Sequence, residues 1–182
     1  LRGAALAASW ARRTLALLAA LVLLAACTAD AHPIVKLGVI APFEGQGRPL
    51  GYAVLPAVKQ VAAEANARGD FGDYRVLVVA FSDDLDPGRA AEQARALALD
   101  GDVMAVTGPF TRATAAAAVP VLAEAGIPYL ALDSAAPAGS NHAADEEQAR
   151  KAATALLQAL AADIVKHGEP SRAGVAAELA LR

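Results

Sequence analysis

The chain has few of the residues on which disulfide-rich proteins and metalloenzymes depend. It contains one cysteine, Cys27, in 182 residues, which excludes a disulfide framework within the chain and a thiolate metal site. The three histidines, His32, His142 and His167, are scattered along the sequence, and none accompanies a nucleophile in a recognisable catalytic arrangement. We therefore predict no enzymatic activity, no cofactor and no bound metal.

Basic charge and long apolar runs are also scarce. The formal net charge is −3, which gives no electrostatic case for a nucleic-acid partner. The apolar run from Leu15 to Leu24 is about ten residues long, and a bilayer core of about 30 Å needs roughly twice that length. The run is therefore too short to span a membrane, whereas it has the length of a signal-peptide core.

The residues around this run predict a lipid anchor at Cys27. Arginines precede the run without any acid, and two alanines stand between Leu24 and Cys27. This order resembles the bacterial lipobox, in which the cysteine thiol is acylated and becomes the first residue of the mature protein. We predict a lipoprotein signal peptide over 1–26, a tether over 27–33 and an extracytoplasmic location at a membrane. An ordinary secretory signal with an incidental cysteine is the alternative.

Beyond the tether, strand and helix signals alternate. Continuous apolar stretches separated by helical patterns predict βαβ units and a parallel sheet that is covered on both faces. The fold class is therefore α/β, as a three-layer α/β/α arrangement with a mainly parallel sheet of about four strands. We expect strands at 34–40, 74–81, 103–107 and 127–132.

Helices are expected between and after these strands, following a Gly/Pro loop over 41–50. Proline suits a first helical turn, because its missing N–H is unpaired there, and Asp and Ser are good N-caps. The predicted helices cover 56–68, 87–100 with Asp86 as N-cap, 112–125 with an interruption at Pro120, 145–167, and 171–181 with Ser171 as N-cap. On the fourth helix, the residues expected to share an apolar face are Leu156, Leu157, Leu160, Ile164 and Val165.

Gly45, Gly47 and Gly51 imitate a dinucleotide-binding fingerprint. The fit is poor, because the first strand does not turn directly into the glycines. The first acids at the end of a second strand, Asp83 and Asp84, also come later than the roughly 20 residues that the fingerprint needs. Pro49 also falls where the helix should start. A mobile Gly-rich loop is the favoured interpretation, and a nucleotide-dependent enzyme stays open as a minor alternative.

Asp83, Asp84 and Asp86 suggest a metal site. No further acid or histidine stands at ligand spacing from them. The favoured interpretation is that these acids close the second strand and cap the helix that follows.

The best candidate for a ligand site is the turn over 108–114, which joins the third strand to a helix. Ligands of open parallel sheets bind outside the carboxyl ends of the strands, and a helix N-terminus offers free N–H groups to a carboxylate. Two threonines supply hydroxyls here and an arginine supplies a guanidinium, while the loop after the fourth strand would lie beside them. Plain helix capping is the alternative. The predicted ligand-binding residues are Thr111, Arg112, Thr114, Asp133 and Ser134.

Four stretches, taken in order, resemble the type I periplasmic binding protein family, the leucine-binding lipoproteins of branched-chain amino acid ABC transporters. Order and spacing carry the resemblance, because no single motif is specific. The stretches are VKLGVIAP at 35–42, EANARG at 64–69, the acids of 83–86 with Pro87, and GP at 108–109 with Pro120 and GIP at 126–128.

The resemblance implies a binding protein for an amino acid or another small anion, with an ABC permease as its partner. In the family, small hydroxyl residues after the GP turn hold the ligand carboxylate. Here Arg112 stands at what we take to be the main position, where a bulky cation favours a larger anionic ligand or fills the cleft.

The tail over 155–175 resembles the family's late helices, which normally follow a second lobe. We therefore expect a single lobe over 34–182, made of βα repeats over 34–139 and C-terminal helices over 143–182. The second lobe is expected to be missing, with the join near 140–151. A structural lipoprotein that docks a partner through the exposed inter-lobe face is the alternative function.

Overall fold

The computed structural model describes residues 32–132 and 142–182. Three residues predicted from the sequence to be functional, Cys27, Asp133 and Ser134, lie outside these ranges. Pro33–Arg182 forms one compact unit. No helix in the described part of the chain is long and apolar enough to cross a membrane.

Four parallel strands form the sheet, in the order β2-β1-β3-β4. This arrangement confirms the predicted α/β class with a parallel sheet. Because β1 lies between β2 and β3, the chain reverses its direction of winding after the second strand. The strands are β1 (Ile34–Ala41), β2 (Arg75–Ser82), β3 (Val103–Thr107) and β4 (Tyr129–Leu130).

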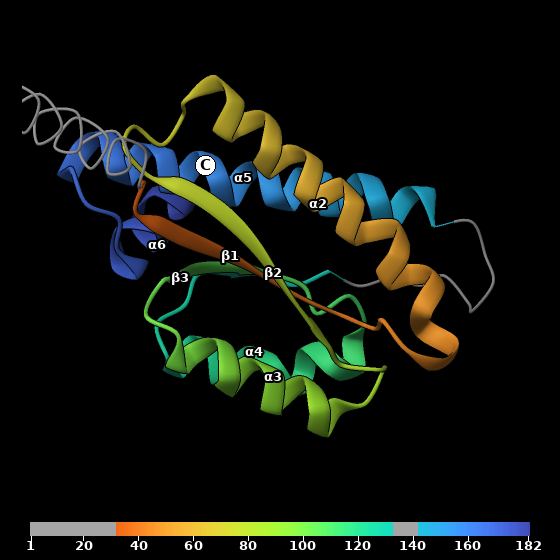
Figure 1. The fold of residues 1–182 in the computed structure, drawn as a ribbon. Helices are drawn as coiled ribbons and strands as arrows, with labels where there is room; N and C mark the ends of the chain where they lie inside the picture. The colour runs from red at the N-terminus through yellow and green to blue at the C-terminus, as the bar shows by residue number, and fades with distance from the viewer. Residues whose placement is uncertain (1–31, 133–141) are drawn as a thin grey trace, which may run out of the picture. The chain divides into compact units, whose positions relative to one another are not determined.

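Helices cover both faces of the sheet (Figure 1). On one face lie α2 (Arg48–Arg68) and α5 (Ala143–His167), and on the other lie α3 (Pro87–Leu99) and α4 (Arg112–Glu124). A short 3-10 turn, η1 (Gly45–Gly47), leads into α2, and α6 (Arg172–Ala180) packs on α5 and β3. The three-layer arrangement predicted from the alternating pattern is therefore present.

Two hydrophobic cores follow from the alternation of side chains along β1. Val39 belongs to the core beneath α2 and α5, whereas its neighbour Ile40 belongs to the core beneath α3 and α4. Successive side chains of a strand point to opposite faces, so a strand buried on both faces must be apolar throughout. This requirement explains the near-continuous apolar sequence of β1.

The helix predicted over 56–68 begins eight residues earlier, at Arg48. Pro49 occupies its first turn, where a proline costs little, so the expectation that Pro49 opposes a helix start was wrong. Pro56 lies inside the helix on the solvent side, where water can satisfy the carbonyl group that loses its partner. Burial of Leu50 and Val54 on the opposite side stabilises the first turns.

Three further expectations about the elements were wrong. The helix α4 continues through Pro120, which is exposed, rather than being interrupted there. Only Tyr129 and Leu130 of the predicted strand over 127–132 are strand residues, although backbone bonds beside β3 extend from the carbonyl of Pro128 to the N–H of Leu132. Val165 is 84% exposed rather than part of the apolar face of α5.

The corner between α5 and α6 is built around a buried acid that the apolar pattern did not reveal. The Asp163 side chain is fully buried, and its Oδ2 accepts the N–H of Ser171 at 2.8 Å. Its Oδ1 lies 2.6 Å from Nδ1 of His167. Ser171 then caps α6 as predicted, since its hydroxyl accepts the N–H of Gly174.

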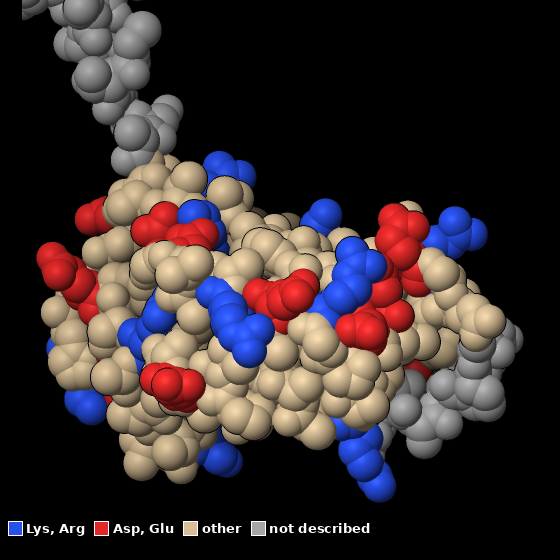
Figure 2. All heavy atoms as spheres, turned by 90° about the horizontal axis from the view of Figure 1, so that it is seen from below, with Lys and Arg blue, Asp and Glu red and all other residues tan. Residues whose placement is uncertain are grey.

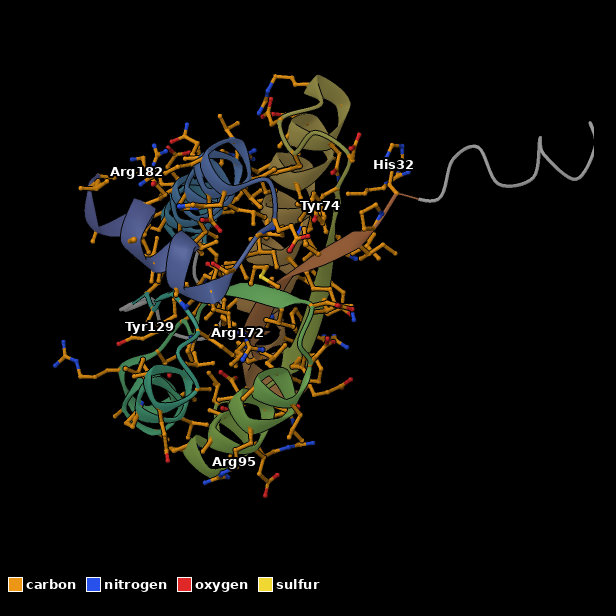
Figure 3. All side chains as sticks on the ribbon, turned by 90° about the vertical axis from the view of Figure 1, so that its left-hand side faces the viewer. His32, Tyr74, Arg95, Tyr129, Arg172 and Arg182 are labelled. Carbon is orange, nitrogen blue, oxygen red and sulfur yellow. The ribbon has the colours of Figure 1, made fainter. Side chains whose placement is uncertain are left out.

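Arg172 ties α6 to the opposite layer (Figure 3). Its guanidinium donates to the carbonyls of Asp100 at 2.7 Å and Val103 at 2.9 Å, and more weakly to those of Ala98 and Ala125. These carbonyls lie at the ends of α3 and α4 and at the start of β3, where helices leave unpaired acceptors. The C-terminal helices are therefore an integral part of the lobe.

Candidate functional site

The loops after β1, β2 and β3 meet at the carboxyl edge of the sheet and hold one another in place. The Ser82 hydroxyl accepts the N–H of Phe43 at 2.9 Å, which joins the first two loops. A Cβ atom on Gly47 would lie 2.6 Å from the ring of Pro42 and 2.8 Å from Cγ of Leu85. A Cβ atom on Gly108 would lie 2.2 Å from the carbonyl oxygen of Ile40, and this glycine also has φ of +86°. The edge is thus close-packed, and side chains are excluded at these glycines.

The first turn of α4 faces this edge. Thr111 caps the helix, because its hydroxyl accepts the N–H of Thr114 at 3.4 Å. The hydroxyl oxygens of Thr111 and Thr114 lie 2.8 Å apart, and the Thr114 hydroxyl also lies 3.2 Å from the carbonyl oxygen of Thr111. Capping, which was the alternative to ligand binding for these threonines, is therefore present.

Exposure divides the predicted site residues into two kinds. Thr114 is fully buried, Thr111 is half-buried and Arg112 is exposed. Only Thr111 and Arg112 therefore present side-chain groups to a solute, with Thr114 beneath them. The next predicted loop residues, Asp133 and Ser134, lie outside the described ranges.

An open, mostly apolar hollow of about 400 Å³ adjoins Arg112. Its other lining residues come from the next turns of α4 and from the chain just after β4, and they are Ala115, Ala116, Val119, Pro120, Ala131 and Leu132. Apolar walls with a few polar groups at one end are typical of small-molecule sites.

Asp83 is a further polar residue at this edge. The sequence predicted that it closes the second strand, and it was not assigned to the ligand site. Its side chain is fully buried, Oδ1 accepts the N–H of Leu85 at 3.1 Å, and Oδ2 has no hydrogen-bond partner among the described residues. Burial raises the pKa of the Asp83 carboxyl, while the Leu85 N–H and the Thr114 hydroxyl oppose that rise. An acid directly after a mostly apolar strand is the signal that points to it in the sequence.

The other two acids of this loop have the structural roles expected for them. Asp84 bonds to the Ser82 hydroxyl and to Arg89, and these two groups lower the pKa of its carboxyl. Asp86 caps α3, since its Oδ1 accepts the N–H of Arg89 at 2.7 Å. Within residues 32–132 and 142–182, no group of three or more His, Cys, Asp or Glu side chains is arranged to hold a metal ion.

The glycines that imitate a dinucleotide fingerprint serve close packing. Gly47 lies against Pro42 and Leu85, and a Cβ atom on Gly51 would stand 2.0 Å from the carbonyl oxygen of Pro42. Their turn leads into α2 through η1 rather than directly from β1.

Acidic and basic side chains are interspersed on the face formed by α3 and α4 (Figure 2).

The sequence of residues 34–177 matches the family described as periplasmic binding protein. The chain belongs to the periplasmic binding protein family. This family consists of binding proteins rather than enzymes, so the predicted lack of enzymatic activity is confirmed. The resemblance drawn from the sequence is confirmed as well.

Solved structures support the same fold. The branched-chain amino acid transporter substrate-binding protein of Streptococcus pneumoniae, in complex with isoleucine, is 28% identical with a TM-score of 0.51, over 54% of this chain and 28% of that one. A possible leucine/isoleucine/valine-binding protein of Rhodopirellula baltica is 23% identical with a TM-score of 0.51, over 55% and 27%. An ABC transporter substrate-binding protein of Sphaerobacter thermophilus is 21% identical with a TM-score of 0.50, over 57% and 27%.

The periplasmic binding protein lobe seen here therefore aligns with less than a third of each of these relatives. No curated protein sequence matches the chain.

Proposed function

We propose that this chain is an extracytoplasmic solute-binding protein of an ABC transporter, and that it holds the carboxylate of a small ligand at the first turn of α4. The observation that carries the proposal is the placement of Thr111 and Arg112. Both stand at the carboxyl edge of a parallel sheet, on a helix N-terminus that favours anions, in a member of the periplasmic binding protein family. The S. pneumoniae relative in complex with isoleucine makes isoleucine the first ligand to test.

The proposed role of each residue follows from its exposure to solvent. Thr111 and the α4 N–H groups bind the carboxylate, and Arg112 adds a positive charge above an apolar hollow that suits an aliphatic side chain. Thr114 acts from below by holding the Thr111 hydroxyl. Asp133 and Ser134 complete the proposed site from the next loop.

A single lobe is the second part of the proposal. The α5–α6 pair packs directly on the βα units, through the buried Asp163 corner and through Arg172. A clamshell binding protein encloses its ligand by closing two domains about a hinge, whereas one lobe covers only one side of a ligand. We therefore propose that this lobe alone binds weakly.

The third part is the lipid anchor at Cys27. The motif before it supports acylation of the thiol, which would keep the binder beside its permease. Substitution Cys27→Ser is expected to abolish lipid labelling in cells and to release the protein from the membrane fraction. Labelling that persists in this variant would contradict the anchor without affecting the proposed ligand site.

An NMR titration of the purified monomer with isoleucine tests the ligand site. We expect millimolar binding, with shifts concentrated at residues 111–116, and loss of these shifts in Arg112→Ala. The matched control is Arg95→Ala, which removes an exposed arginine from α3. Micromolar or tighter binding would contradict the weak single lobe, and an absence of shifts at millimolar isoleucine would contradict an amino-acid site.

The rival function, a lipoprotein that docks a partner through the exposed inter-lobe face, predicts a different result. Crosslinking in cells would then capture a stable complex in the absence of any small ligand. This capture would be unchanged in Arg112→Ala only if the partner does not contact α4.

A further inference from the structure

The amino end of the sheet has an uncovered stretch on the side of α3. Helix α3 packs on β1 at Gly38, where an added Cβ atom would lie 3.1 Å from Cδ2 of Leu97. Before this contact, Ile34 of β1 is 44% exposed and Leu77 of β2 is 41% exposed. Figure 1 shows the start of β1 and the end of α3 at this same edge. Part of an apolar sheet face is therefore left in contact with solvent.

The exposed apolar side chains at this edge surround Lys36. Ile34 lies on the same face of β1 as Lys36, because successive strand residues alternate between faces, and Leu77 is the register partner of Lys36 on β2. Leu99, which is 90% exposed, directly precedes Asp100, and Asp100 Oδ2 accepts from Lys36 Nζ at 2.8 Å. We call Ile34, Leu77 and Leu99 the Lys36 patch.

The charges of this patch balance one another. The Lys36 ammonium group lies 2.8 Å from Oδ2 of Asp100 and 3.1 Å from Oδ2 of Asp102. Arg75 is exposed and is the register partner of Ile34, so it places a guanidinium group at the rim of the patch. A guanidinium group is well suited to bind phosphate. Apolar side chains with an arginine at their rim fit the interface of a phospholipid bilayer.

The length of the tether indicates which surface this patch meets. Cys27, the proposed site of acylation, precedes Ile34 by seven residues. Seven residues reach at most about 25 Å in any conformation. Once the thiol is anchored, the amino edge of the sheet stays within this distance of the lipid headgroups. The bilayer is then present at the patch at a high effective concentration.

We propose that the anchored lobe rests on the phospholipid surface through the Lys36 patch, with Arg75 bound to lipid phosphate. This inference rests on the proposed anchor at Cys27 and is independent of the proposed ligand. The strand β1 has eight residues, so its carboxyl edge lies roughly 25 Å further along the strand than Ile34. The turn that is proposed to bind the ligand therefore faces away from the lipid, towards the solute.

The tether is essential to this contact. Three apolar side chains offer too little area to hold a free protein on a bilayer, since even one acyl chain gives only marginal binding. Attachment at Cys27 makes the contact intramolecular, which removes most of the cost of association. The contact is therefore expected in the attached protein and not in the free one.

Methyl NMR of the lobe attached to lipid nanodiscs tests the contact without relying on acylation in cells. Because Cys27 is the only cysteine, the chain that begins at Cys27 can be coupled through its thiol to a maleimide phospholipid. The nanodiscs consist of phosphatidylcholine with a spin label on the headgroup, which broadens the signals of nearby methyl groups. We expect the signals of Ile34, Leu77 and Leu99 to be lost, whereas that of Leu85, which is exposed after β2 at the opposite edge, is retained.

A pair of matched variants separates the patch from the tether. Leu99→Asp should bring back the signals of Ile34 and Leu77, because a charged group there opposes contact with the lipid. Tyr52→Asp changes an exposed apolar residue of α2 in the same way and should leave the loss of signal unchanged. Cys27→Ser, which cannot be coupled, should keep every signal on the same nanodiscs.

The outcomes distinguish the contact from the anchor. Equal broadening at Leu85 and at the patch, or broadening that Leu99→Asp does not reduce, would overturn the proposal. Shifts of the patch signals with the concentration of Cys27→Ser protein, in the absence of lipid, would assign the patch to a second copy of the chain and would overturn it as well. Broadening confined to the patch, combined with no lipid labelling of Cys27 in cells, would refute the anchor and support the patch as a lipid-binding surface.

Discussion

Gly174 lies directly against the buried carboxylate of Asp163. A Cβ atom at Gly174 would stand 1.8 Å from Oδ1 of Asp163, far inside any normal contact distance. The same carboxylate accepts the Ser171 N–H and pairs with His167, so it cannot move away without losing both partners. The corner between α5 and α6 therefore requires glycine at this position, although its backbone is ordinary helix.

Gly174→Ala should consequently destabilise the lobe. Alanine has the better helix propensity, but overpacking against a fixed carboxylate should cost about 1–3 kcal/mol. Urea unfolding followed by circular dichroism measures the change. Gly101→Ala is the matched control, because a Cβ atom there meets nothing within 4 Å, and its effect should be close to zero. Equal midpoints for the two variants would contradict the packing argument.

Arg172→Met should weaken the attachment of α6 to the α3–α4 layer. Methionine keeps much of the apolar stem but cannot donate to the carbonyls of Asp100 and Val103. Loss of these bonds from a charged donor should cost about 2 kcal/mol in unfolding free energy. The control Arg95→Met removes an exposed arginine of α3 (both residues are labelled in Figure 3) and should change stability by less than about 0.5 kcal/mol. Equal changes in unfolding free energy for Arg172→Met and Arg95→Met would show that the guanidinium hydrogen bonds contribute nothing to stability.

Periodicity and caps predicted most of the lobe. Asp86 and Ser171 begin helices where their capping chemistry indicates, and Gly168 ends α5 in the left-handed conformation. The errors arose where tertiary packing outweighs local preference. Pro56 is tolerated inside α2 because the buried face of the helix stabilises it. Asp163 occupies a core position of α5, whereas the apolar pattern predicts core positions only for the apolar residues near it.

The site was less predictable than the fold. The turn after β3 could be proposed from its place at a strand end, and Thr111 and Thr114 do lie together there. That Thr114 is buried beneath Thr111, with Asp83 next to it, depends on how the loops of three strands meet. No local pattern contains that information, since Asp83 and Thr114 belong to different βα units.

Thr111→Val should remove the α4 cap while leaving the buried Thr114 in place. Loss of the side-chain acceptor for the Thr114 N–H should cost about 1 kcal/mol of unfolding free energy. Thr111→Ser keeps the acceptor and should lose less than half of that amount. Hydrogen exchange at the first turn of α4 would locate the effect, and equal losses in the two variants would contradict a capping role.

The Asp84 carboxyl should stabilise the lobe in a pH-dependent manner. The Ser82 hydroxyl first, and Arg89 in addition, lower the pKa of this group below its ordinary value of 3.8. A depressed pKa in the folded state means that the unfolded chain binds the proton more readily, so the stabilisation is present above pH 3.8 and is lost as pH falls through the folded-state pKa. Asp84→Asn is the suitable variant, because φ at this residue is +49° and asparagine tolerates that conformation.

The difference in unfolding free energy between the wild type and Asp84→Asn should therefore be constant from pH 8 to about pH 5 and shrink in stronger acid. Urea titrations at pH 7, 5, 3 and 2 measure it. Glu92→Gln, an exposed acid-to-amide change on α3, corrects for the loss of one negative charge. A difference that stays constant down to pH 2 would mean that the ionised form of Asp84 contributes nothing, because protonation would then leave its contacts with Ser82 and Arg89 as strong as before.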